Sequence, residues 1–183
     1  MLWDLKLKVG HSSRTIKDCV RLGKVDFTIR TAMLEQRHVI GDSKLSKELE
    51  KTLSENLFFG SEQEFIEAKL NERETRHEKQ GGQRYIVEPN VKEGKGGLRD
   101  LHSLFWIAKY VHRVKTIGEL VDLGLFTKEE YKIFQTAETF LWAVRSHLHL
   151  IGNRASDHLS FDLQVEVANA MNYQDKGGRR AVE

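Results

Sequence analysis

The 183-residue sequence has one cysteine, one proline and no long apolar run. The single cysteine, Cys19, excludes an internal disulfide and favours a reducing, cytoplasmic setting. A membrane-spanning helix needs roughly 18 consecutive apolar residues, and none of the apolar stretches reaches that length. The first residues also lack the pattern of a signal peptide. We therefore expect no membrane partner.

Neither sign of charge dominates the sequence. It has 29 Lys and Arg residues against 27 Asp and Glu residues, which gives a net charge of +2. This balance gives no global field for nucleic acid, so no nucleic-acid partner is expected. With 39% hydrophobic and 31% charged residues, the composition is typical of a globular protein of one domain or slightly more.

The run from Glu88 to Asp100 is the most informative segment. It contains the only proline and three glycines within four positions, which are Gly94, Gly96 and Gly97. A glycine-rich turn before a helix can present backbone N–H groups to an anion. The spacing differs from that of a P-loop, so that interpretation fails.

Cations surround this turn, and they suggest a phosphate site. Lys92, Lys95 and Arg99 all lie within or beside it. We name Lys92 and Arg99 as the best candidates for phosphate contacts. The alternative is a purely structural turn before a capped helix, in which Arg99 and Asp100 pair with each other's neighbours.

Hydrophobic periodicity predicts a small α/β segment followed by helices. Apolar residues alternate at Leu5, Leu7 and Val9 and again at Val25, Phe27 and Ile29, which predicts two strands. A helical pattern runs from Thr31 to Gly41. Beyond that point almost every pattern is helical, including a stripe at Leu45, Leu49 and Leu53, a charged helix over 61–80, a helix that begins near Asp100 and a last helix over about 162–173.

The clearest helical signal begins at Thr127. The sequence Thr127-Lys128-Glu129-Glu130 is a capping-box pattern, and apolar residues then follow one helical face as far as Ile151. The predicted fold is therefore mainly α. It combines a small α/β segment over residues 1–41 with a helical-bundle domain over residues 42–183.

Four stretches together resemble one protein family. They are Leu2-Trp3-Asp4-Leu5 with Val9-Gly10-His11-Ser12-Ser13-Arg14-Thr15; Leu34-Glu35-Gln36-Arg37 with Gly41-Asp42; Glu88 to Asp100; and Phe140-Leu141-Trp142 with Arg145, Leu148 and His149. In this order they resemble the bifunctional PII uridylyltransferase/uridylyl-removing enzymes. The element Lys-x-Gly-x-Gly-Gly-Leu-Arg-Asp is also similar to one in glutamine-synthetase adenylyltransferase.

The resemblance implies a reaction, a cofactor and partners for the full-length enzyme. Such enzymes transfer UMP from UTP to a tyrosine of the PII nitrogen-regulatory protein, with Mg²⁺ or Mn²⁺. Paired carboxylates hold the cations that activate the attacking oxygen and neutralise the leaving pyrophosphate. The resemblance places residues 1–41 at the end of the nucleotidyltransferase domain and residues 42–183 in the helical domain that follows it.

Two signatures of the family are missing from this sequence. No Asp-x-Asp metal pair occurs anywhere, and no His-Asp dipeptide of the phosphohydrolase domain is present. Both ends look cut, so we interpret the chain as an interior fragment. We expect it to be inactive alone and to hold no metal or other cofactor by itself.

Two further residues are candidates for the reaction. Asp26 alternates with Val25 and Phe27, so it could face a cleft and act as a base for the incoming tyrosine hydroxyl. The alternative is a solvent-facing strand residue or a cap. Arg14 is a candidate for the nucleotide pocket, with packing or solvent exposure as its alternative.

Two other functions stay open at this point. A separate polypeptide could supply the missing catalytic half, in which case an Asp-x-Asp pair is expected in the neighbouring upstream reading frame. Alternatively, the chain is a non-catalytic helical interaction module or nucleotide-binding module from a split or decayed gene. UTP binding that depends on Lys92 and Arg99 would favour the nucleotide-binding alternative.

Overall fold

The computed structural model describes residue 4, residues 9–81 and residues 86–182. The chain divides into two compact units, Met1–Gln63 and Glu64–Glu183. This division falls further along the chain than the boundary expected after residue 41. Each unit is described by itself.

The first unit contains three short α-helices and a π-helical turn. They are α1 (Ile16–Val25), α2 (Phe27–Leu34), α3 (Ser43–Leu53) and η1 (Ser54–Phe58). Side-chain caps explain where two of them begin. The Thr15 hydroxyl accepts a hydrogen bond from the Asp18 N–H at 3.1 Å, and Asp42 accepts one from the Lys44 N–H at 2.8 Å. Each cap satisfies a helical donor that would otherwise lack a partner.

The strand predicted around residues 25–29 is wrong. These residues lie in two helices that meet at Asp26, which ends α1 and caps α2. The Asp26 carboxylate accepts hydrogen bonds from the N–H groups of Thr28 at 2.7 Å and Ile29 at 3.0 Å. Three alternating apolar residues are too few to outweigh such a capped helix start. The other predicted strand falls mostly on residues 5–8, which lie outside the described residues.

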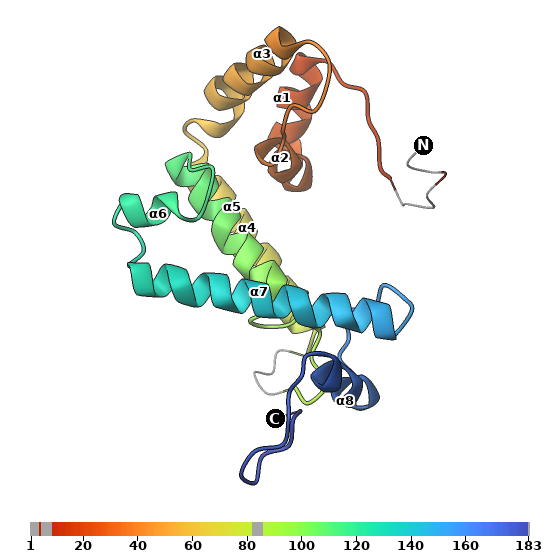
Figure 1. Ribbon diagram of the computed structural model, residues 1–183. Helices are drawn as coiled ribbons and strands as arrows, with labels where there is room; N and C mark the ends of the chain where they lie inside the picture. Colours follow the sequence, from red (N-terminus) through yellow and green to blue (C-terminus); the bar gives the residue numbers. More distant parts are fainter. Residues whose placement is uncertain (1–3, 5–8, 82–85, 183) are drawn as a thin grey trace. The chain divides into compact units, whose positions relative to one another are not determined.

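The second unit is helical, as predicted. Its helices are α4 (Glu62–Lys79, which begins just before the unit boundary), α5 (Leu98–His112), α6 (Glu119–Asp122), α7 (Lys128–Ile151) and α8 (Phe161–Ala170). Figure 1 shows α5 beside α4, with α7 crossing them and α8 near the far end of α7. The capping box at Thr127 is confirmed, because its side chain and that of Glu130 each accept the other's backbone N–H.

Apolar contacts join the helices of this unit. The rings of Phe65 on α4 and Tyr110 on α5 are stacked, with centroids 3.9 Å apart, and both side chains are fully buried. A second cluster contains Val91, Val144, Leu148 and Val167, which come from the glycine-rich segment, α7 and α8. Burial of side chains of this size stabilises a fold by roughly 1.5–3 kcal/mol each.

The glycine-rich segment is therefore part of the core. Val91 is buried against α7 and α8, and its N–H donates to the carbonyl of Asp157 at 2.9 Å. Asn90 and His158 form an isolated antiparallel bridge beside it. These contacts fix the start of the turn, so the charged side chains that follow it project from a rigid base.

Candidate functional site

The backbone of the glycine-rich turn satisfies its own hydrogen bonds. The N–H groups of Leu98 and Arg99 donate to the carbonyls of Val91 at 3.0 Å and Lys92 at 2.9 Å. The Gly97 N–H donates to Gly94, and the Gly96 N–H donates to the Asp100 carboxylate at 2.8 Å. These donors at the start of α5 are used within the turn. The expected presentation of backbone N–H groups to an anion is therefore wrong for them, and any anion must be bound mainly by side chains.

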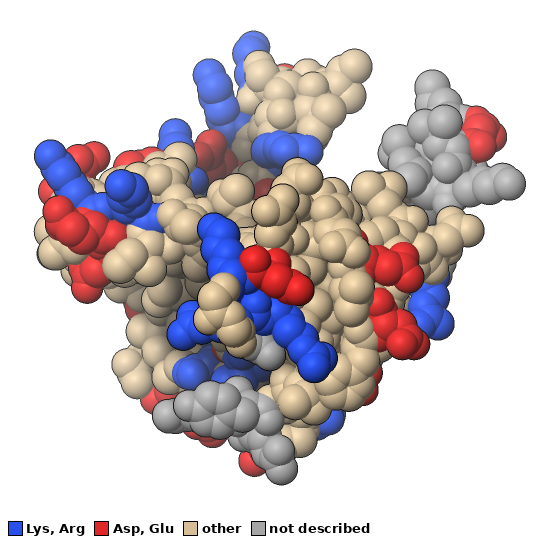
Figure 2. Space-filling view, turned by 60° about the horizontal axis from the view of Figure 1, so that its bottom comes forward, with Lys and Arg blue, Asp and Glu red and all other residues tan. Residues whose placement is uncertain are grey.

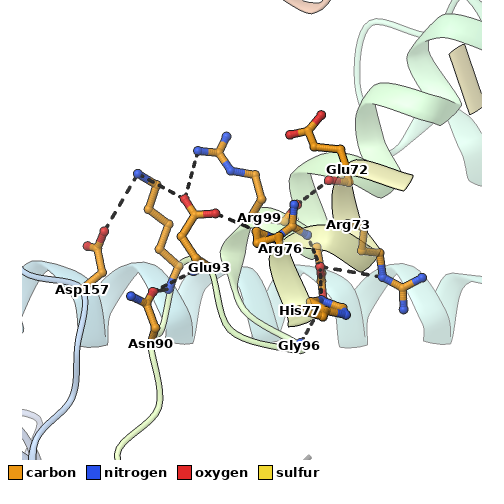
Figure 3. A network of polar contacts seen from close by, with 12 residues as sticks. Glu72, Arg73, Arg76, His77, Asn90, Glu93, Gly96, Arg99 and Asp157 are labelled. Atoms are coloured by element: carbon orange, nitrogen blue, oxygen red, sulfur yellow. Dashed lines mark hydrogen bonds and ion pairs between the residues drawn. The ribbon is translucent and has the colours of Figure 1, made fainter. Parts of the chain in front are cut away.

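Asp100 is the centre of a polar network that joins α4 to the turn. Its carboxylate accepts hydrogen bonds from Arg76 and lies 3.0 Å from the Nε2 atom of His77. The guanidinium of Arg73 lies 3.8 Å away. Figure 3 shows these α4 side chains pointing toward the turn, near Gly96. Asp100 thus pairs with side chains of α4 and with the Gly96 N–H of the turn.

The pKa of Asp100 is lowered by this environment. Burial alone would raise the pKa, because a charged carboxylate loses water. The hydrogen bonds from the Gly96 N–H, Arg76 and His77 outweigh burial and hold the pKa below its ordinary value of 3.8. The carboxylate is therefore a charged structural anchor at neutral pH.

The cations that the sequence singled out meet at Glu93. Lys92 Nζ lies 3.5 Å and Arg99 Nη2 lies 3.3 Å from the same oxygen, Oε1. Arg76 Nε approaches the other oxygen, Oε2, at 3.8 Å. The structure thus brings the charged ends of Lys92 and Arg99 together at one oxygen of Glu93. Figure 3 shows Arg99 and Glu93 side by side.

A second anchor, Asp157, lies next to Lys92. It accepts a hydrogen bond from Arg145 Nε at 2.7 Å, contacts His149 Nε2 at 2.8 Å, and lies 3.9 Å from Lys92 Nζ. Burial opposes ionisation here too, but the contacts with Arg145 and His149 lower the pKa of Asp157. This anchor connects α7 to the cationic end of the turn.

The other two candidates lie in the first unit. Asp26 is occupied as the cap of α2, and the hydrogen bonds from Ile29 and Thr28 lower its pKa, with a further contribution from the charge of Arg14. Arg14 lines a pocket of about 720 Å³ together with Arg37 and His38. The cap is the alternative named for Asp26, and a catalytic role for it stays a prediction.

Sequence reasoning missed Arg76, His77, Glu93 and Asp157. Arg76 and His77 lie in a charged stretch that is typical of a solvated helix face, and only the packing of α4 against the turn buries them. No group of three or more His, Cys, Asp or Glu side chains within the described ranges could hold a metal ion. None of the described helices is long and apolar enough to cross a membrane.

The surface charge in one view is mixed. Figure 2 shows Lys and Arg side chains gathered near the middle of one face, with Asp and Glu side chains beside them. This pattern agrees with the small net charge and with a network in which cations and carboxylates alternate.

Comparison with known proteins identifies the family. The model of the family described as GlnD PII-uridylyltransferase matches residues 64–183, which is the whole second unit. The chain belongs to the PII-uridylyltransferase family. No solved structure matches it.

Curated relatives match the chain from end to end. The bifunctional uridylyltransferase/uridylyl-removing enzyme of Ruegeria pomeroyi is 64% identical over 183 residues, and that of Cereibacter sphaeroides is 62% identical. The enzyme of Novosphingobium aromaticivorans is 57% identical over 182 residues. Each match covers 100% of this chain and 20% of the relative, so the chain spans about one fifth of the length of these family members.

Proposed function

We propose that this chain is the helical part of a PII uridylyltransferase, and that it supports the cleft in which UMP passes from UTP to a tyrosine of PII. The observation that carries the proposal is the family match over the whole second unit, together with relatives named as uridylyltransferase/uridylyl-removing enzymes. The role of the unit is positional. Asp100 and Asp157 hold the turn, and Lys92 and Arg99 extend from it toward the triphosphate.

The chain should not catalyse the transfer by itself. Nucleotidyl transfer in this family depends on Mg²⁺ or Mn²⁺ held by paired carboxylates, and the sequence contains no Asp-x-Asp pair. Incubated with PII, UTP and Mg²⁺, the purified chain should incorporate no labelled UMP into PII. A full-length relative serves as the positive control. Incorporation by the 183-residue chain would refute the proposal, whereas incorporation only after a second polypeptide is added would support a split enzyme.

A nucleotide-binding role is favoured by one specific observation, the convergence of Lys92 and Arg99 on a single carboxylate oxygen. Two cations so placed can contact one phosphate group, and charge-assisted hydrogen bonds of this kind contribute roughly 1.5–3 kcal/mol each. We expect Lys92→Ala or Arg99→Ala to weaken UTP binding about tenfold in calorimetric titrations. Lys128→Ala, an exposed lysine at the start of α7, is the control. If the affinity for UTP were unchanged in all three variants, Lys92 and Arg99 would no longer be assigned as phosphate contacts.

A further inference from the structure

Glu93 occupies a position where an anion is surrounded by cations from three places in the second unit. Lys92 precedes it in the turn, Arg99 lies in the first turn of α5, and Arg76 projects from α4. The three nitrogen–oxygen distances are 3.5, 3.3 and 3.8 Å. Strong charge-assisted hydrogen bonds are shorter, about 2.7–2.9 Å. The glutamate therefore fits loosely among these three cations, which we call the cradle.

Arg76 provides independent evidence that the cradle suits a different acceptor. Its side chain is nine-tenths buried, with 10% exposed, and Asp100 occupies only its Nη2 atom. Among the described residues, Nε and Nη1 have no hydrogen-bond partner. Buried donors of this kind are nearly always satisfied, because leaving them unpaired costs free energy. The Nε atom lies 3.8 Å from Glu93 Oε2, and this contact indicates where a further acceptor would bind.

We propose that Glu93 is an internal substitute for a phosphate group, and that a phosphate-bearing ligand displaces it from Lys92, Arg99 and Arg76. A phosphate group brings more negative charge and three oxygens, so it can satisfy donors that a loosely seated carboxylate leaves unpaired. This inference rests on the proposed phosphate contacts of Lys92 and Arg99. It adds a third cation and a competing anion that sets the affinity of the site.

The turn allows this exchange without a change in its backbone. The Asn90 side-chain oxygen accepts the N–H groups of Glu93 at 2.7 Å and Lys92 at 3.1 Å, so the main chain is held while the Glu93 side chain can rotate away. The side chains of Lys92, Glu93 and Arg99 are 33%, 28% and 27% exposed. Solvent, and hence a ligand, can reach them.

The test is the effect of Glu93→Gln on phosphate binding by the full 183-residue chain. Removal of the competing charge should tighten the binding of inorganic tripolyphosphate about tenfold in calorimetric titrations at fixed ionic strength without divalent ions. UTP should show a change in the same direction. Glu78→Gln is the matched control, because it removes one negative charge from an exposed position near the end of α4.

Each outcome separates this inference from the proposed function. Tighter binding in Glu93→Gln and unchanged binding in Glu78→Gln would support the displacement. A second outcome is that wild type, Glu93→Gln and Glu78→Gln bind tripolyphosphate equally well while Lys92→Ala binds it more weakly. That result would overturn the role of Glu93 and leave the phosphate site standing. If neither wild type nor Glu93→Gln bound tripolyphosphate or UTP, both the role of Glu93 and the proposed phosphate site would be overturned.

Discussion

Replacement of Asp100 by alanine should lower the free energy of unfolding by about 3 kcal/mol. The change removes the carboxylate that Arg76, His77 and the Gly96 N–H share, and it leaves the mostly buried Arg76 charge without its closest acceptor. The loss of one partner of a buried pair is costly because the remaining charge stays desolvated. Urea denaturation followed by circular dichroism measures the effect. Asp122→Asn, at an exposed position in α6, is the control and should change stability little.

The same carboxylate should make stability depend on pH. Because the folded state lowers the pKa of Asp100, its contribution is fully present above the ordinary value of 3.8. It is lost as the pH falls from that value through the lower pKa of the folded state. Wild type should therefore lose more stability than Asp100→Asn between neutral pH and about pH 3. Parallel pH profiles for the two proteins would contradict the anchoring role of Asp100.

The helices of the second unit were largely predictable because their signals are local. Residues 127–151 combine a capping box with a long apolar face, and α7 covers Lys128–Ile151. The charged pattern over 61–80 likewise corresponds to α4, Glu62–Lys79. Periodicity and caps act within a few residues of each other, so one sequence is enough to detect them.

The strand prediction near Asp26 failed because two competing signals occupy the same residues. Alternation over Val25, Phe27 and Ile29 favours a strand, whereas an aspartate followed by helix-compatible residues favours a cap. The cap provides two hydrogen bonds to the Asp26 carboxylate, and these bonds lower its pKa.

The polar network could not be predicted because it is a product of tertiary packing. Asp100 and Arg76 are 24 positions apart, and Arg145 and Asp157 are 12 apart. The pairing of residues across such separations depends on which faces of α4, α5 and α7 meet. Sequence did identify the cationic turn itself, since Lys92 and Arg99 flank its glycines. It did not indicate that carboxylates already surround those cations.

Gly97→Ala should destabilise the chain by about 3 kcal/mol, at the upper end of the cost of overpacking. An added Cβ atom would stand 2.8 Å from the carbonyl oxygen of Val91 and 3.0 Å from those of Lys92 and Gly94. All three are backbone atoms, and they accept the N–H groups that close the turn and begin α5. Relief of the contact must therefore lengthen hydrogen bonds of the turn, and no flexible side chain can move aside instead.

Two other glycines separate this steric effect from the cost of backbone conformation. Gly96 has a φ of +77° with open space around its Cβ position, so Gly96→Ala should cost only about 1 kcal/mol from left-handed strain. Gly10 has neither a positive φ nor a near neighbour, so Gly10→Ala should be neutral within about 0.5 kcal/mol. Urea denaturation of the three variants should give this order of losses. If Gly97→Ala lost no more stability than Gly96→Ala, the turn would have to relax around the added methyl group. Close packing of its carbonyls would then not explain the glycine at position 97.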